Sequence, residues 1–537
     1  MILKSFERLK FGVIFLLILV TGVTLHAGRS PVYFNVLDYG AKADGITKNT
    51  EAIKRAIDTA AEAGGGTVYF PSGEYLTGPI HLRSHITIFV DAGATLKFSR
   101  DFDDYLPMIT SRWEGTVGMN FSPFIYGYQV EDIAIRGQGT LDGQGEAWWQ
   151  FLRNLKEEQN RFGEVRTQTK WQKMHQELNQ KTIKPDNWNW NASHFLRPPF
   201  IHPFDCKNIL IEGVTIKNSP FWTINPALCE NVTVTGVTIL NPPDSYNTDG
   251  INPTSCRNVR ISDCLISVGD DCITLKSGRD EDGRRIGKPT ENVTITNCTM
   301  MSGHGGVVIG SEMSGDVRKI AISNCVFDGT DRGIRIKSMR GRGGIVEEIR
   351  VSNIVMKNIQ REAIVLNMFY QETPDEPVSD RTPCFRNIHI SNLTASRVRR
   401  AGQLLGLEEM PIDNVTLNDI NIDAEEGFSI QNAKNIELHD ITVNTKKGAA
   451  LTAENIQNLE VDGFKTLSPR DAVPVFALKN VENAFIHDTN PVPGTTQYLE
   501  VTGAQSRDIR LSGNNFYHVK TPVVLDSSVQ ADAVNQE

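Results

Sequence analysis

A short phrase of alternating apolar and polar residues recurs along most of this chain, and it restricts the possible folds more than any other feature. The phrase begins with a polar residue, most often Asn. Examples are Asn208-Ile209-Leu210-Ile211, Asn231-Val232-Thr233-Val234 and Asn258-Val259-Arg260-Ile261. Further copies begin at Asp132, Asn292, Lys319, Glu348, Asn387, Asn414, Asn435 and Asn458. Alternation with a period of two is typical of a strand that is buried on one face.

The spacing of the phrase predicts how these strands are arranged. From Asn208 onward, successive copies begin 21 to 39 residues apart. Such a short strand cannot bury its apolar face alone, so repeats of this length indicate coils stacked around a continuous core. We therefore predict an all-β fold, a right-handed parallel β-helix. A β-propeller and a leucine-rich horseshoe are the alternatives, but a propeller blade needs about 40 or more residues and the horseshoe consensus is missing.

One helix is expected near the start of the array, at residues 50–63. Ile53, Ala56, Ile57, Ala60 and Ala61 share one helical face, and the glycines from Gly64 onward would end the helix. A stack of coils has an open end that must be covered, so we expect this helix to cap it.

The first residues indicate export. Lys4, Arg8 and Lys10 precede an apolar stretch, residues 11–25, which is followed by His26-Ala27. That stretch is short for a membrane span. We predict a signal peptide at residues 1–27, with an uncleaved anchor as the alternative. Residues 28–537 would then form a single β-helix domain, periplasmic or secreted, with no membrane attachment after cleavage.

Residues 148–191 interrupt the repeats. This stretch is polar, lacks the phrase, and contains Trp148, Trp149, Trp171, Trp188 and Trp190. We predict a partly helical insertion that leans over one end of the groove. Its tryptophans could stack on sugars, but packing of the insertion onto the body is the more ordinary use of such side chains.

Eight cysteines in an exported chain could form disulfides. However, Cys264, Cys298 and Cys325 each occupy a repeat position where other copies carry Val, Ile or Leu. We therefore predict that these three thiols point inward and pack as small apolar groups.

Four polar clusters interrupt the repeats in the middle of the chain. They are Asn247-Thr248-Asp249, Gly269-Asp270-Asp271, Gly303-His304-Gly305 and Arg335-Ile336-Lys337. Their separations match the length of one coil, so the clusters are expected to stack in one groove. Asp270 and Asp271 would face opposite sides of an ideal strand, so a bend at Gly269 is needed to bring both carboxyl groups to the groove.

Carboxylates gathered in a groove can hydrolyse glycosides, because one donates a proton while another takes a proton from water. Crowding raises the pKa of one of them and keeps it protonated. Arg335 and Lys337 share one face of their strand, and Arg332, Arg340 and Arg342 are expected to extend this cationic patch. The net charge of −9 gives no general attraction for nucleic acid, so the local patch indicates a ligand that carries carboxylates.

In these four clusters, the chain resembles glycoside hydrolase family 28, the polygalacturonase family, over about residues 32–460. The resemblance implies an inverting hydrolase acting on α-linked galacturonic acid in pectic poly- or oligosaccharides. Asp270 would be the general acid, Asp249 and Asp271 would activate water, and His304 would support the acid. Arg335 and Lys337 would bind the substrate carboxylate, with further contacts from Asn247 and Tyr370. Inversion predicts carboxyl groups roughly 6.5 to 9.5 Å apart.

Several alternatives remain open at this stage. Residues 111–115 and the insertion resemble bacterial exo-acting members, which favours exo over endo action. A hydrolase directed at rhamnogalacturonan is also possible. Less favoured are a Ca²⁺-dependent lyase, in which the acidic residues would hold the ion, and a non-catalytic carbohydrate-binding β-helix. No sequence motif requires a metal or an organic cofactor.

Overall fold

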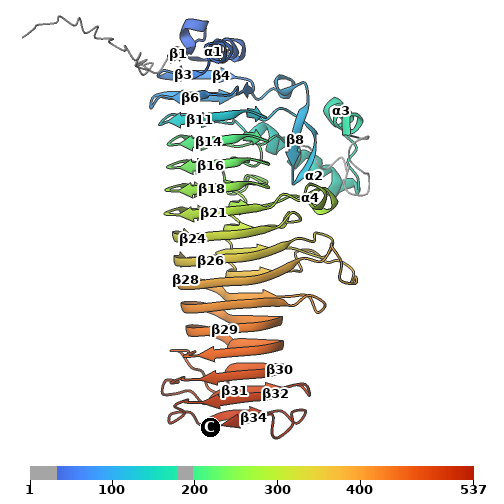
Figure 1. The fold of residues 1–537 in the computed structure, drawn as a ribbon, viewed down its shortest axis with the longest axis vertical. Helices are drawn as coiled ribbons and strands as arrows, with labels where there is room; N and C mark the ends of the chain where they lie inside the picture. Colours follow the sequence, from blue (N-terminus) through green and yellow to red (C-terminus); the bar gives the residue numbers. More distant parts are fainter. Residues whose placement is uncertain (1–32, 168, 180–196, 537) are drawn as a thin grey trace, which may run out of the picture. The chain divides into compact units, whose positions relative to one another are not determined.

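A computed structural model describes residues 33–167, 169–179 and 197–536, which form a right-handed parallel β-helix (Figure 1). The predicted signal peptide and two of the insertion's tryptophans, Trp188 and Trp190, lie outside these residues. Within the described residues, no helix is both long and apolar enough to cross a membrane.

Most coils begin with a long strand. These strands are β11 (Glu131–Gly137), β14 (Lys207–Glu212), β16 (Glu230–Thr235), β18 (Arg257–Ser262), β21 (Thr290–Thr296), β24 (Val317–Asp328), β26 (Ile345–Lys357), β28 (Cys384–Leu405), β29 (Ile412–Asp462), β30 (Pro474–His487), β32 (Arg507–Ser512) and β34 (Val534–Gln536). The recurring phrase falls on these strands from β11 to β29, as its alternation predicts.

Shorter strands complete the coils. The second strand of a coil is β12 (Thr140–Asp142), β15 (Thr215–Lys217), β17 (Thr238–Leu240), β19 (Leu265–Ser267) or β22 (Thr299–Ser302). The third is β20 (Asp271–Leu275), β23 (Gly305–Ile309), β25 (Ile334–Lys337) or β27 (Glu362–Asn367), and we call these four strands the site layer. Near the C-terminus the coils also contain β31 (Gln497–Thr502) and β33 (Thr521–Leu525).

The N-terminal coils use shorter elements. They contain β1 (Tyr33–Asn35), β2 (Asp44–Lys48), β3 (Gly66–Phe70), β4 (Gly73–Thr77), β6 (Ile86–Val90) and β7 (Ala94–Phe98), with 3-10 helices at Val36–Tyr39 and Phe102–Tyr105. A separate three-stranded layer joins β5 (Ile80–His81), β10 (Ile125–Tyr128) and β13 (Ile201–Phe204), and an antiparallel hairpin joins β8 (Ile109–Trp113) to β9 (Thr116–Asn120).

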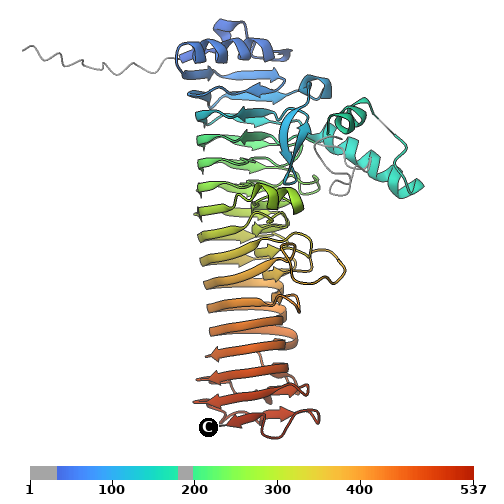
Figure 2. The same cartoon turned by 45° about the vertical axis from the view of Figure 1, so that its right-hand side comes forward.

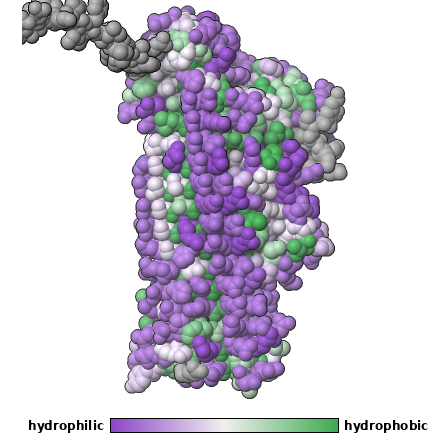
Figure 3. All heavy atoms as spheres, viewed as in Figure 1, coloured by the Kyte–Doolittle hydropathy of each residue, from purple (hydrophilic) through white to green (hydrophobic). Residues whose placement is uncertain are grey.

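The core consists of apolar side chains stacked at equivalent positions of successive coils. Ile209, Val232, Val259 and Val293 pair in parallel register, and each is at most 3% exposed. Because side chains alternate between the two faces of a strand, the same register places polar residues outside. The face of the molecule in Figure 3 is accordingly mostly hydrophilic.

The asparagine that begins the phrase has a structural role. Asn208, Asn231, Asn258 and Asn292 all have φ between 56° and 60°, the left-handed region that asparagine tolerates better than most residues. Their side-chain amides form a ladder: Asn231 donates to Asn208 at 3.0 Å, Asn258 to Asn231 at 3.2 Å, and Asn292 to Asn258 at 3.1 Å. The ladder therefore fixes the turn of each coil onto the next.

The predicted capping helix is present as α1 (Thr50–Glu62) at the N-terminal end of the coils (Figure 1). It buries Ala52, Ile53, Ala56, Ile57 and Ala60, while the predicted Ala61 is only partly buried. The helix ends before Gly64 and Gly65, whose φ angles are +88° and +114°.

The insertion is partly helical, as predicted, with α2 (Glu146–Phe162) and α3 (Lys170–Asn179) standing out from the coils (Figure 2). Trp148 and Trp149 are buried, and Trp148 and Trp171 contact the ring of Phe102. These three tryptophans pack within the protein and are not free to stack on a ligand.

All eight cysteines are free thiols, and Cys264, Cys298 and Cys325 are each at most 2% exposed. Their predicted inward packing is confirmed.

Candidate active site

The four polar clusters meet on adjacent coils, as their spacing predicted. Asp271 begins β20 and pairs with Gly305, the neighbour of His304, at the start of β23. In the next coil, Arg335 of β25 pairs with Val308 of β23. On the preceding coil, the amide of Gly250 donates to the carbonyl of Asp271 at 3.0 Å, which brings Asp249 alongside.

The bend predicted at Gly269 follows from local contacts. A side chain at this position would come within 2.3 Å of the carbonyl oxygen of Ser245, so only glycine fits. The amide of Gly269 donates to Thr248 Oγ1 at 3.2 Å. The central threonine of the first cluster thus holds the turn that presents Asp270 and Asp271.

One oxygen of each of Asp249, Asp270 and Asp271 lies within 4.8 Å of the other two. The predicted separation of roughly 6.5 to 9.5 Å refers to the whole carboxyl groups of the acid and the base and stays a prediction. The shared turn directs two consecutive carboxyl groups toward Asp249 instead of leaving them on opposite faces.

Asp249 is the most strongly perturbed of the three carboxyl groups. It is 2% exposed, and burial raises its pKa well above the usual range; neighbouring Asp270 raises the pKa further. Asn252 donates to its Oδ2 at 2.9 Å. Asp249 therefore retains its proton under conditions in which isolated carboxyl groups would be ionised.

Asp271 has the opposite environment. Lys337 Nζ is 2.8 Å from its Oδ2, and Arg335 Nη1 is 3.5 Å from its Oδ1. Burial would raise the pKa of Asp271, but these two cations and Lys276 outweigh it and lower the pKa to about 2. In the described part of the chain, Oδ1 has no hydrogen-bond partner. Asp271 is thus an ionised carboxylate whose buried Oδ1 faces Arg335 without a hydrogen bond to any described residue.

His304 contacts the carboxyl group that it was predicted to support. Its Nδ1 is 3.0 Å from Asp270 Oδ1, and its side chain is 51% exposed. The hydrogen bond to Asp270 raises the pKa of His304. Gly303 before it has φ +145°, and a side chain there would come within 2.4 Å of the carbonyl of Asp270.

Asn247 and Tyr370, the two further predicted contacts, both line the pocket around the acids. Asn247 Oδ1 accepts a hydrogen bond of 2.7 Å from Arg197 Nη2, which fixes its side chain. The ring of Tyr370 lies near the cations, 5.2 Å from Lys337 Nζ and 5.8 Å from the guanidinium carbon of Arg335.

The cationic patch is smaller than predicted. Arg332 pairs with Glu362 at 3.0 Å, and Arg340 pairs with Glu409 through two nitrogens. These two arginines are therefore neutralised outside the pocket. Arg342 does line the pocket, where it pairs with Asp280 at 2.5 Å.

The pocket has a volume of about 400 Å³, and several of the residues that line it were not predicted. Lys276 Nζ pairs with Glu312 at 2.7 Å, and both side chains are buried. Lys276 also lies 4.7 Å from the ring of Trp222. These partners lie on different coils in no recognisable motif, so only the stacking of the coils brings them together.

Trp113 and Glu114 of the β8–β9 hairpin also line the pocket. Glu114 pairs with Arg279 at 2.9 Å, just before α4 (Asp280–Ile286). The charged stretch after Ser277 therefore contains a short helix. Its acidic first turn and basic last turn match the helix dipole.

A parallel β-helix whose pocket combines a protonated acid, an ionised acid and buried cations defines a glycoside hydrolase that acts on acidic sugars. The comparisons with known proteins support this class. The sequence model for glycosyl hydrolases family 28 matches residues 184–439, and that for rhamnogalacturonase A/epimerase, pectate lyase-like, matches residues 33–197. The chain belongs to glycosyl hydrolases family 28.

Individual relatives agree. A probable polygalacturonase of Vitis vinifera is 31% identical over 398 residues, which cover 72% of this chain and 74% of the relative. The solved exopolygalacturonase of Thermotoga maritima is 34% identical with a TM-score of 0.63, covering 76% of this chain and 93% of that one. The family 28 exopolygalacturonase of Yersinia enterocolitica is 22% identical with a TM-score of 0.64, covering 86% and 79%, and supports the fold.

Proposed function

We propose that this hydrolase removes galacturonic acid from the ends of homogalacturonan chains. The observation that carries the proposal is the buried pairing of Asp271 with Lys337 and Arg335, close to Asp270 and to Asp249, whose raised pKa keeps it protonated. A substrate carboxylate is attracted to the cations of this pocket, because arginine and lysine bind carboxylates by charge-assisted hydrogen bonds.

Asp270 is the proposed general acid. It is the member of the pair that faces the solvent-exposed His304, while Asp249 is buried. Asp249 holds a proton in the free enzyme and can pass it to Asp270, whose carboxyl oxygen lies within 4.8 Å, as the glycosidic oxygen binds. Asp271 is ionised and is the proposed acceptor of a proton from the attacking water. Lys337 and Arg335 keep Asp271 ionised and, with Tyr370 and Asn247, bind the sugar.

Exo action is supported by the hairpin and loop residues that line the pocket. Trp113 and Glu114 of the hairpin line it together with Arg279, and the Glu114–Arg279 ion pair connects the hairpin to the loop before α4. We propose that this connected hairpin and loop restrict the pocket to a chain end. The Thermotoga relative, which has a similar fold, is described as exo-acting.

A time course of products from homogalacturonan tests the proposal. We expect galacturonic acid alone from the first time points, without unsaturated ends. Asp270→Asn should lower kcat by about 10²- to 10⁴-fold, because general acid catalysis contributes that much. Mixed oligomers at early times would show endo action, and ultraviolet-absorbing ends would show a lyase. Full activity of Asp270→Asn would remove the proposed acid.

The stereochemistry needs its own measurement, because the nearest acid oxygens are close together. Inversion is the outcome that the family resemblance implies. Proton NMR of the first product will show the β-anomer if an α-linkage is inverted. Initial formation of the α-anomer would show retention and would require a carboxylate nucleophile instead of an activated water.

We also propose that the enzyme is exported. Residues 1–27 direct the chain to the periplasm or the medium, and residues 28–537 form the mature enzyme as one domain. The support is the basic and apolar pattern of the first residues. N-terminal sequencing of the enzyme from the exported fraction should begin at Gly28. Recovery of a chain that still starts at Met1 in the membrane fraction would show the uncleaved anchor instead.

A further inference from the structure

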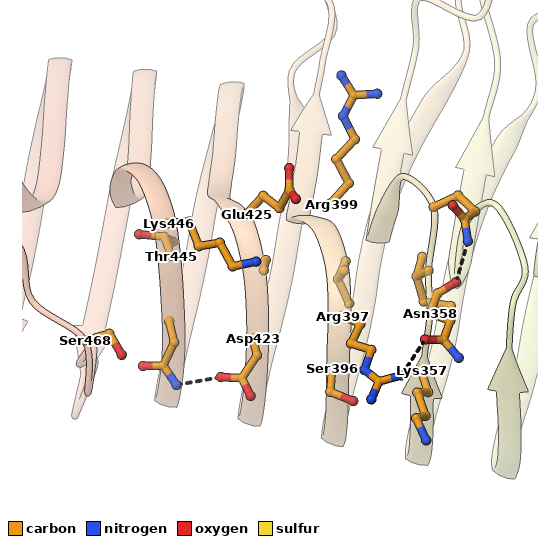
Figure 4. Close-up of a pocket in the computed structure, with 15 residues that line it drawn as sticks. Lys357, Asn358, Ser396, Arg397, Arg399, Asp423, Glu425, Thr445, Lys446 and Ser468 are labelled. Carbon is orange, nitrogen blue, oxygen red and sulfur yellow. Dashed lines mark hydrogen bonds between the residues drawn. The ribbon is translucent and has the colours of Figure 1, made fainter.

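A second groove, of about 860 Å³, lies on coils that follow the active site along the chain (Figure 4). Its charged lining residues are Lys357, Arg397, Arg399, Lys446, Asp423 and Glu425. Figure 4 shows them on successive turns of the β-helix, next to one another. Four cations against two acids give this groove a positive excess, although the whole chain carries a net charge of −9.

The groove continues from the turn that holds the catalytic residues. Backbone hydrogen bonds connect successive turns: His304 donates to Asp270 at 2.9 Å, Asp331 to Gly303 at 2.8 Å, Arg361 to Asp331 at 2.7 Å, and Arg400 to Arg361 at 2.9 Å. We call this series the turn column. The groove therefore begins three coils beyond Asp270, about 14 Å away at the usual strand spacing. A polymer lying along the coils would reach it.

The acids around the groove do not neutralise its arginines. Glu362 pairs with Arg332, and Glu426 pairs with Arg400. At the far end, Asp423 accepts a hydrogen bond from Asn444 at 2.7 Å, and Glu425 lies 4.0 Å from Lys447.

Among the described residues, Arg361, Arg397 and Arg399 form no ion pair. Glu362 pairs in register with Arg400, so the residues that precede them, Arg361 and Arg399, lie on adjacent coils. Both side chains are exposed. Like charges on adjacent strands are destabilising without a counter-charge. Two unpaired arginines in this arrangement, with Arg397 close by, therefore indicate that an anion binds between or beside them.

We propose that this groove is a distal binding site for the acidic sugar chain whose end is cleaved at Asp270. The inference rests on the proposed function, because that function supplies a ligand with regularly spaced carboxylates. Arg397 and Arg399 bind carboxylates of sugars remote from the cleaved bond. Short substrates end before the groove, whereas long chains occupy both sites and are bound more tightly.

Binding to catalytically slowed protein tests this site directly. In the Asp270→Asn background, we compare the Kd of trigalacturonate with that of a galacturonate oligomer long enough to pass 14 Å by several sugars. Arg397→Ala with Arg399→Ala should weaken binding of the long oligomer by about tenfold and leave the Kd of trigalacturonate unchanged. Added salt should reduce the advantage of the long oligomer in the unmodified groove.

The matched control removes two cations from the outer face of β14 and β18, as Lys207→Ala with Arg260→Ala, and should change neither Kd. Arg399→Glu alone should weaken long-chain binding further than Arg399→Ala. Thermal unfolding verifies that each variant is folded.

The outcomes separate the two proposals. An unchanged ratio of long-chain to short-chain affinity in the double arginine variant would overturn the distal site, as would an equal loss for both ligands. If the protein bound neither oligomer and released no galacturonic acid, the proposed function itself would fail. Release of galacturonic acid with an unchanged affinity ratio would overturn the distal site alone.

Discussion

Asp249, Asp270 and Asp271 are alike in chemistry but are placed in different surroundings. Asp249 is buried and next to another acid, so its pKa is raised. Asp271 is equally buried, yet Lys337, Arg335 and Lys276 lower its pKa to about 2. A proton donor and a proton acceptor are thereby formed from the same side chain within 4.8 Å.

Lys337→Met should separate the electrostatic role of this lysine from its contact with substrate. Removing it takes a neighbouring positive charge from the buried carboxylate of Asp271. We therefore expect the free energy of unfolding at pH 7 to fall by about 3 to 5 kcal/mol. In the unmodified protein, the lowered pKa of Asp271 stabilises the fold above about pH 4, and this contribution is lost as the pH falls toward 2.

In Lys337→Met the burial of Asp271 raises its pKa, so protonation stabilises the variant. The stability difference from the unmodified protein should therefore shrink between pH 7 and pH 4, as measured by thermal unfolding across that range. Lys357→Met, at an exposed position, is the control and should cost little at any pH. A deficit for Lys337→Met that is the same at every pH would contradict this account.

A single coil has little stability by itself, because its strands are short and most of its contacts are with the neighbouring coils. The asparagine ladder shows how this contact is made at a turn. Each asparagine adopts a backbone conformation that most residues avoid, and the amide of Asn258, for example, bonds to the coils on both sides.

Replacing Asn258 separates these two contributions. Asn258→Gly keeps the left-handed backbone and loses only the two side-chain hydrogen bonds, so we expect a loss of about 1 to 2 kcal/mol in unfolding free energy. Asn258→Ala also strains the backbone and should cost about 1 to 2 kcal/mol more. Urea unfolding of both variants measures the difference. Equal stability of the two, or a more stable alanine variant, would show that the backbone conformation has no part in the effect.

Much of this could be predicted from the sequence, because the signal was local and repeated. The phrase at Asn208 and its later copies set the strand register, and the apolar face around Ile53 identified α1. Pairs such as Lys276 and Glu312 were missed, because partners 36 residues apart meet only through stacking. The short helix α4 was missed because residues 280–286 carry no apolar periodicity.

The stack of coils has two ends, and strands at an end that is not covered could pair with another chain. At the N-terminal end, α1 covers the first coils with its apolar face. The helix is thus expected to protect the stack from association as well as to complete its core.

Ile53→Asp with Ile57→Asp tests this role, since both side chains are at most 2% exposed. Burying two unpaired carboxylates is costly, so the helix should detach and uncover the end of the stack. We expect a lower soluble yield and high-mass species in size-exclusion chromatography with light scattering. Lys54→Asp with Thr59→Asp places the same charges on the exposed face and should remain like the unmodified protein. Monomeric, fully soluble Ile53→Asp/Ile57→Asp protein would show that α1 is dispensable as a cap.

The turn column described above also has a fixed pitch. Successive turns are one strand spacing apart, about 4.8 Å, whatever the length of the loops that leave them. Side chains at one position of the turn therefore recur at a constant distance along the molecule. Adding or removing one coil after the active site would shift every later residue by one strand spacing and would leave the residues around Asp270 unchanged. The reach of the protein along a polymer can thus change in whole steps, independently of the reaction it performs.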